Sequence, residues 1–342
     1  MQSQKFTIGI DIGGTNTVVG LVAGNGDCVE RIKFFTQEFP TAEVFKMRLL
    51  SGIRELSERL SAVQKIVGIG IAAPAARHRE GTIQSPANLQ WGTIDIVNLL
   101  KPFYNLPIVL MNDSNAAALG EMKFGLAKGM KNFVVITMGT GLGAGIVVDG
   151  RLLYGENGVA GELGHMTIEP GGRLCGCKRQ GCVETYVSAT GIRRTVFELL
   201  ARSTEETELR DISYNELTAE KVHELASRGD TIALEAFEIT GKILGRVLSN
   251  TVAVFDPEAI ILSGGLMHAG DLLLEPTTKS FTENVLMLHK RNAVILKSHL
   301  KDGEAAILGV SSLVSDGAFV TPDGSQTDPE AIPGNVMIEG RG

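Results

Sequence analysis

The chain has 342 residues, of which 44% are hydrophobic and 21% are charged, and it is long enough to form two lobes with separate cores. Its net charge of -7 argues against a nucleic-acid-binding surface, which would need a basic stripe. No apolar run approaches the ~20 residues that span a bilayer, and the first residues show no charged-then-apolar leader for export. We therefore expect a cytoplasmic protein without a nucleic-acid or membrane partner.

Strands and helices alternate in the first part of the chain. Val- and Ile-rich runs that end at turn residues predict strands, and apolar residues at helical spacing predict helices. In the helix near residue 50, this spacing includes Val44, Met47 and Ile53. In chain order, we predict strands over 6–11, 17–22 and 28–35, a helix over 41–64, a strand over 65–72, a helix over 94–104, a strand over 107–111 and a helix over 114–124.

The opening order of elements then recurs. Strand, glycine turn, strand, tight turn and strand appear twice, which indicates an internal duplication with one copy starting each lobe; two unrelated glycine hairpins are the alternative. We place the smaller N-terminal lobe at 1–114 plus about 300–314, the larger lobe at 115–299 and a disordered tail at 315–342. The later predicted elements are strands over 132–137, 142–148 and from 151, helices over 192–202, 219–228 and 231–254, strands over 259–262 and 293–297, and a helix over 304–313.

One short segment holds three of the four cysteines. His165, Cys175, Cys177 and Cys182 supply the four Cys or His ligands that a tetrahedral Zn²⁺ site requires, and Cys28 is left over. A disulfide or a chance cluster is the alternative, and the disulfide fits poorly with a chain that shows no export leader. We predict a structural Zn²⁺ that holds a loop with little core of its own.

Glycine turns are candidates for nucleotide binding, because a residue without a Cβ lets the backbone approach a phosphate closely. Asp11 in the first turn would hold a hydrated Mg²⁺. No Walker P-loop is present, and the turn after residue 137 leads into a strand rather than into the helix of a dinucleotide fingerprint. An ordinary hairpin is the alternative for each turn alone. The residues concerned are Asp11, Gly13, Gly14, Thr15 and Asn16, then Gly139, Thr140 and Gly141, and finally Gly264 and Gly265.

Asp113 lies where a predicted buried strand runs directly into a helix, so the helix dipole keeps its carboxylate ionised. The alternative is that Asn112 and Asp113 form a helix cap. Further polar groups, which mostly accept hydrogen bonds from hydroxyls, suit a neutral polyol and would repel a substrate that already carries phosphate. These groups are Asn88, Asn112, Glu162, His165 and Glu184. An ionised aspartate can accept a sugar hydroxyl's proton as that oxygen attacks phosphorus.

Together, these motifs resemble the ROK sugar kinases, within the hexokinase/actin-like superfamily, over residues 6–313. Residues 11–15 resemble the family's phosphate-1 turn, residues 138–141 its phosphate-2 turn and residues 263–265 its adenosine turn. The cysteine segment is similar to the family's sugar-and-zinc signature. The resemblance implies an α/β, two-lobed actin-like ATPase (ribonuclease H-like) fold with duplicated β-hairpin phosphate turns.

The resemblance also implies an activity, the phosphorylation of a hexose by ATP at its 6-hydroxyl in glycolysis, with glucose the first candidate. It implies Asp113 as the general base, His165 as a zinc ligand, Glu162 and Glu184 as sugar ligands, and a homodimer or homotetramer. An N-acetylglucosamine or N-acetylmannosamine kinase is one alternative. A sugar-sensing regulator is another, although we expect no room for a helix-turn-helix domain before a first strand that starts at residue 6.

Three positions depart from the family's pattern. Lys178 replaces a glycine that is common after the second cysteine, and Ala75 ends a turn that is usually Gly-x-Pro-Gly. Asn16 replaces a frequent lysine beside the first phosphate turn. None of these departures removes a reacting group.

Overall fold

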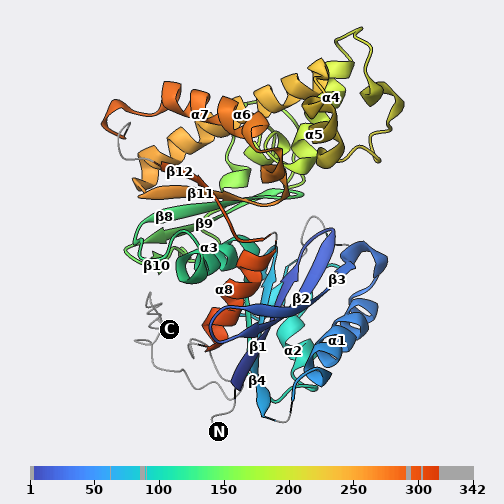
Figure 1. Cartoon of the computed structure of the whole chain (residues 1–342), viewed down its shortest axis with the longest axis vertical. Helices are drawn as coiled ribbons and strands as arrows, with labels where there is room; N and C mark the ends of the chain where they lie inside the picture. The colour runs from blue at the N-terminus through green and yellow to red at the C-terminus, as the bar shows by residue number, and fades with distance from the viewer. Residues whose placement is uncertain are drawn as a thin grey trace. The chain divides into compact units, whose positions relative to one another are not determined.

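The computed structural model describes residues 4–61, 63–84, 89, 91–289, 294–301 and 303–315 (Figure 1). Its contacts divide the chain into two compact units, residues 1–131, 145–160 and 299–342 and residues 132–144 and 161–298. Within the described ranges, none of the helices is both long enough and apolar enough to cross a bilayer. The tail predicted to be disordered over 315–342 begins one residue too early, because Ser315 ends the last helix; residues 316–342 lie outside the described residues.

The first unit is built on a five-stranded sheet of order β3-β2-β1-β4-β7. Its strands are β1 (Gln4–Ile12), β2 (Asn16–Ala23), β3 (Cys28–Phe35), β4 (Gln64–Ala73) and β7 (Ile108–Asn112). β1, β2 and β3 pair antiparallel, whereas β1, β4 and β7 run parallel. The carboxyl ends of β1, β4 and β7 therefore meet at one edge of the sheet, where residue 11 lies near the end of β1 and residue 113 follows β7.

Helices and a small hairpin complete this unit. In Figure 1, α1 and α8 lie on opposite sides of the sheet. The elements are α1 (Ala42–Glu58), β5 (Ala76–Arg77), β6 (Thr82–Ile83), α2 (Ile96–Leu100), α3 (Asp113–Phe124) and α8 (Glu304–Ser315). The predicted helix over 94–104 is thus shortened to five residues, and the hairpin β5–β6 was not predicted.

The buried face of α1 differs from the predicted one. Ile53 is buried as predicted, but Val44 and Met47 are 47% and 65% exposed, and Phe45 and Leu49 are buried instead. The aromatic ring explains the difference, because Phe45 packs into a cluster of rings and so orients the helix about its axis. The helix also ends at residue 58 rather than 64.

A second five-stranded sheet repeats the first, with order β10-β9-β8-β11-β12. Its strands are β8 (Phe133–Met138), β9 (Leu142–Val148), β10 (Arg151–Leu152), β11 (Ala259–Ser263) and β12 (Val294–Lys297). β8, β11 and β12 run parallel and β10 pairs antiparallel with β9, so each strand has a counterpart in the first sheet. The strand order confirms the predicted duplication.

The second unit carries four α-helices among its described residues, and one of them was not predicted. They are α4 (Ala189–Leu200), α5 (Ala219–Ser227), α6 (Thr231–Phe255) and α7 (Asp271–Asn284). α7 escaped prediction because Pro276 interrupts its sequence pattern. Packing against α6 stabilises it, with Leu273, Thr277 and Phe281 buried at helical spacing.

The chain also contains short 3₁₀-helices, which connect these elements. They are η1 (Thr36–Glu38), η2 (Leu163–His165), η3 (Val183–Thr185), η4 (Glu208–Asp211), η5 (Gly265–Ala269) and η6 (Met287–His289). η2 and η3 contact each other. η2 includes His165 and η3 includes Glu184, two of the predicted site residues.

The unit boundary lies later in the chain than the expected boundary at residue 114. Residues 115–131 and 145–160 belong to the first unit, although we expected them in the larger lobe. The physical reason is that α3 packs closely along α8 of the same unit, where the small side chains of Ala116 and Ala305 are buried.

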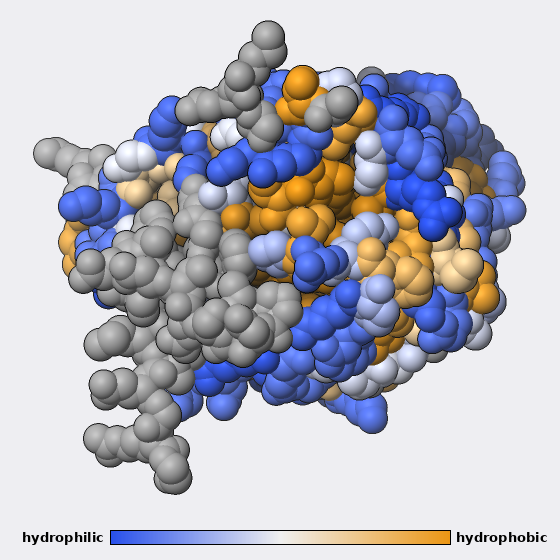
Figure 2. Space-filling view, turned by 90° about the horizontal axis from the view of Figure 1, so that it is seen from below, coloured by the Kyte–Doolittle hydropathy of each residue, from blue (hydrophilic) through white to orange (hydrophobic). Residues whose placement is uncertain are grey.

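Some hydrophobic side chains reach the surface. Figure 2 shows them gathered in the middle of one face, with hydrophilic residues around them. In the first unit, Met47, Val63 and Phe103 are 65%, 57% and 56% exposed. Because apolar atoms supply more than half of an ordinary protein surface, this exposure by itself does not mark a binding site.

Candidate active site and metal centre

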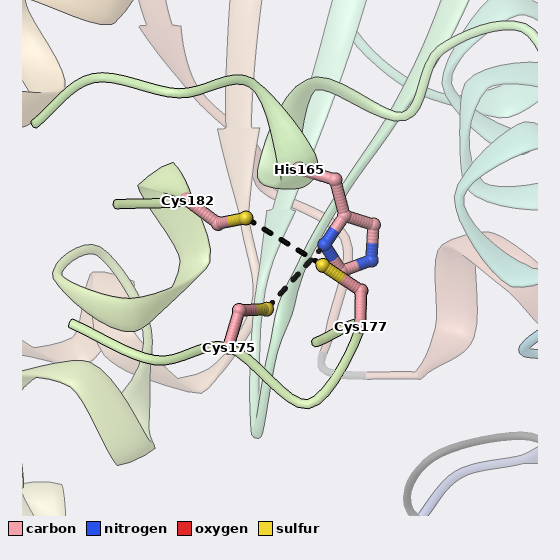
Figure 3. A group of neighbouring side chains, drawn as sticks. All are labelled: His165, Cys175, Cys177 and Cys182. Carbon is pink, nitrogen blue, oxygen red and sulfur yellow. Dashed lines mark hydrogen bonds between the residues drawn. The ribbon is translucent and has the colours of Figure 1, made fainter. Parts of the chain in front are cut away.

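The four predicted zinc ligands converge in the second unit, and their side chains point toward one another (Figure 3). His165 Nδ1 lies 3.6 Å from Cys175 Sγ, and Cys177 Sγ lies 3.6 Å from Cys182 Sγ. All four ligand atoms lie within 4.8 Å of one another. Sulfur ligands at 2.3 Å from a tetrahedral Zn²⁺ are about 3.8 Å apart. The residues therefore fit a Cys₃His zinc site, and the cysteines are free thiols rather than a disulfide.

Local backbone structure holds these ligands in place. His165 ends η2, and η3 begins immediately after Cys182. An isolated bridge between Thr167 and Cys182 joins the two ends of the loop. Burial raises the pKa of the Cys175 and Cys182 thiols, so a cation would be needed to hold them as thiolates at neutral pH.

Two departures from the family's glycines keep a glycine-like backbone. Ala75 has φ of 52° and Lys178 has φ of 69°, both in the left-handed region. A residue with a Cβ is strained there by about 1 kcal/mol. The backbone at both positions is therefore of the kind that favours glycine.

Two carboxylates lie beside the metal ligands. Glu162 Oε2 is 3.9 Å from His165 Nε2, the ring nitrogen that faces away from the cysteines. Glu184 Oε1 is 3.8 Å from Cys175 Sγ, and its Oε2 accepts a hydrogen bond of 3.1 Å from the N–H of Leu142. The structure thus brings both predicted sugar ligands to the metal cluster.

The second and third glycine turns come together in the same unit. Gly139 donates its N–H to the carbonyl of Gly141 at 3.0 Å, which closes the turn between β8 and β9. Gly264 has φ of 96°, and a Cβ on it would lie 2.6 Å from the carbonyl oxygen of Met138. Only glycine fits there, because the backbone after β11 touches the end of β8.

In the first unit, Asp11 lies near the end of β1 and Asp113 is the first residue of α3, close enough for its carboxylate to affect the pKa of Asp11. Burial, and then the nearby Asp113 carboxylate, raise the pKa of Asp11 to about 7. A cation beside Asp11 would lower this pKa again, so the residue suits the predicted Mg²⁺.

The helix cap of α3 is Asn112. Its Oδ1 accepts the N–H groups of Ser114 and Asn115 at 3.0 and 3.1 Å. Asp113 Oδ1 also accepts the N–H of Ser114, at 2.7 Å. The residue that satisfies these backbone donors of the first helical turn is therefore Asn112, and Asp113 is not needed for this role.

The first glycine turn is closed by a hydrogen bond of 2.9 Å from the N–H of Gly13 to the carbonyl of Asn16. Among the described residues, the buried Oδ1 of Asn16 has no hydrogen-bond partner, and a donor on a bound group would satisfy it. Asn88, a predicted sugar ligand, lies outside the described residues.

Sequence reasoning missed Arg173. This side chain is buried, pairs with both Glu198 oxygens at 2.8 and 2.7 Å, and stacks 4.2 Å from the ring centre of Tyr186. It also donates to the carbonyl of Thr185, the last residue of η3, at 2.6 Å. A lone arginine upstream of Cys175 has no sequence pattern to mark it, because its partners follow 12 to 25 residues later.

The chain is similar to known glucokinases and to a xylose repressor. The chain is 34% identical to a glucokinase of Halalkalibacterium halodurans, over 82% of this chain and 86% of that one. It is 30% identical to a xylose repressor of Caldicellulosiruptor bescii, over 79% of this chain and 68% of the repressor. The solved ROK glucokinase of Streptomyces griseus, in complex with glucose and AMPPNP, has a TM-score of 0.80 and 32% identity and covers 90% of this chain and 98% of its own.

These comparisons confirm the predicted α/β actin-like ATPase fold. The family match extends over residues 7–317, nearly all of the described chain. This protein therefore belongs to the ROK family.

Proposed function

We propose that this ROK protein transfers the γ-phosphoryl group of ATP to the 6-hydroxyl of a hexose, with glucose preferred. The observation that carries the proposal is that Asn112 and Asp113 have separate roles at the start of α3. Asn112 caps the helix, and the Asp113 carboxylate lies near Asp11, the residue suited to Mg²⁺.

In the proposed reaction, Asp113 accepts the proton of the 6-hydroxyl as that oxygen forms its bond to the γ-phosphorus. The bond from this phosphorus to the bridging oxygen breaks, and ADP leaves with the electron pair. The glycine turns would hold the phosphates through backbone N–H groups, with Asn16 beside the first turn. Mg²⁺, when bound, would neutralise phosphate charge.

The glucokinases among the relatives support glucose as the substrate. Glu162, Glu184, His165 and Asn112 are the proposed sugar ligands, with Asn88 as a further candidate. Zn²⁺ would have a structural role at the cysteine loop. We also expect a homodimer or homotetramer in the cytoplasm, which sedimentation and cell fractionation would test.

A xylose repressor among the relatives supports a second candidate, a sugar-sensing regulator without kinase activity. A regulator would bind sugar at the same site as the proposed kinase but would not transfer a phosphoryl group. An N-acetylhexosamine kinase would share the transfer but not the preferred sugar.

The test is ADP release by purified protein with MgATP and a panel of glucose, mannose and the two N-acetylhexosamines. We expect glucose to give the highest kcat/KM, and Asp113→Asn to lower kcat by 10²- to 10⁴-fold. Asp211→Asn, at an exposed position in η4, is the matched control and should change nothing. If no sugar stimulates ADP release while a sugar still raises the melting temperature, the protein is a regulator. If an N-acetylhexosamine is preferred, the choice of glucose is wrong.

A further inference from the structure

We propose that Glu184 is a positioning residue for the glycine turn between β8 and β9, in addition to its proposed contact with sugar. One carboxylate would then connect the metal-binding loop to a phosphate-binding turn of the same unit. The effect of this contact on ATP binding rests on the proposed function.

The contact between Glu184 and the turn is direct. Leu142, the residue that follows the turn, donates its N–H to Glu184 Oε2 at 3.1 Å. A Cβ on Gly141 would lie 2.2 Å from the same oxygen, so glycine is required for the carboxylate to reach this place. A backbone N–H bonded to a carboxylate is a charge-assisted bond, which is stronger than a neutral one.

The segment that follows Glu184 holds the rest of the turn. Ala189 donates its N–H to the carbonyl of Gly139, and Thr190 Oγ1 donates to the carbonyl of Thr140, both at 2.9 Å. Residues 139, 140 and 142 are therefore all bonded to residues 184–190. With its carbonyls occupied in this way, the turn would keep one backbone shape before a phosphate arrives.

The same segment is fixed at its other end by the metal-binding loop. Glu184 comes two residues after Cys182, and its Oε1 lies 3.8 Å from Cys175 Sγ. Arg173 holds the adjacent carbonyl of Thr185 at 2.6 Å. Glu184 therefore has a rigid base, which a positioning residue needs.

The test compares Glu184→Ala, which removes the acceptor, with Glu184→Gln, which keeps an oxygen that can accept the N–H of Leu142. Glu169→Gln is the matched control, because Glu169 lies in the same loop and its carboxylate bonds Arg246 at 3.1 Å. Three quantities are measured on each protein: hydrogen exchange of the Leu142 amide, zinc content, and the Kd for MgATP without sugar.

We expect Glu184→Ala to speed exchange of the Leu142 amide about tenfold and to weaken MgATP binding by about 3- to 10-fold. Glu184→Gln should have a smaller effect than Glu184→Ala on both, because a neutral amide oxygen still accepts the N–H of Leu142 through a weaker bond, and Glu169→Gln should equal the wild type. Gly141→Ala should speed Leu142 exchange as Glu184→Ala does, because the new methyl group displaces the carboxylate. In the Glu184→Ala background, the same change should have no further effect on exchange.

Unchanged Leu142 exchange in Glu184→Ala would overturn the proposal. So would equally fast exchange in Glu169→Gln with Glu184 intact, because the loop as a whole, rather than the Glu184 carboxylate, would then position the turn. If the wild type binds no MgATP, the proposed function fails, while the exchange measurements still decide whether Glu184 positions the turn.

Discussion

Replacing Asp11 with asparagine should stabilise the ligand-free protein at neutral pH while abolishing activity. Burial and the Asp113 carboxylate raise the pKa of Asp11 from 3.8 to about 7. An acid with a raised pKa in the folded state favours folding below its unfolded pKa, and that contribution is lost as the pH rises through the folded pKa. The wild type should therefore lose stability between about pH 4 and pH 7, and Asp11→Asn should not.

The pKa shift of Asp11 sets the size of the gain in stability that we expect for Asp11→Asn. A shift from 3.8 to about 7 corresponds to at most about 4 kcal/mol once Asp11 is fully ionised. Because Asp11 keeps an intermediate exposure, solvent reduces this penalty, and we expect about 2 kcal/mol at pH 8. A difference of this size would raise the melting temperature by roughly 5 °C.

The assay is thermal and urea unfolding of both proteins from pH 5 to pH 8.5, with and without MgCl₂. Asp11→Asn should gain on the wild type as the pH rises, and Mg²⁺ should stabilise only the wild type. Asp113→Asn should reproduce a smaller part of the gain, because burial is the larger cause of the shift. A difference between Asp11→Asn and wild type that is the same at every pH would show that Asp11 is already ionised in the folded protein, and the reasoning would be wrong.

Three other perturbations follow from the second unit and the turns. Cys182→Ser should reduce zinc from one ion per chain to none by elemental analysis, whereas Cys28→Ser should keep it; full zinc in Cys182→Ser would contradict the assigned ligands. Arg173→Lys should lower the free energy of unfolding by about 3 kcal/mol in urea titrations, because lysine lacks the bidentate fork; a loss below about 0.5 kcal/mol would refute this. Ala75→Gly and Lys178→Gly should each raise the free energy of unfolding by up to about 1 kcal/mol, and a lower melting temperature would show that the left-handed backbone is not strained.

Much of the site was predictable because its signals are local. The three cysteines and His165 lie within 18 residues, so their spacing alone indicates a metal site. Each glycine turn lies between a strand and the element that follows it, and the repeated order of elements predicted the repeated sheet topology. The prediction of the buried face of α1 was wrong. Phe45, rather than Val44 or Met47, lies on this face, because the packing of its ring against residues distant in sequence outweighs the periodicity of the helix.

The sequence by itself determined the ligand set, the turns and the acidic junction at residues 112–113, since each depends on neighbours along the chain. Only the tertiary structure decided which of those groups contact or lie near one another. It assigned the helix cap to Asn112, brought the Asp113 carboxylate near Asp11, and joined Glu184 to Leu142 across 42 residues. Such contacts depend on how strands and loops far apart in sequence come together in the fold, and the spacing of residues along the chain does not predict them.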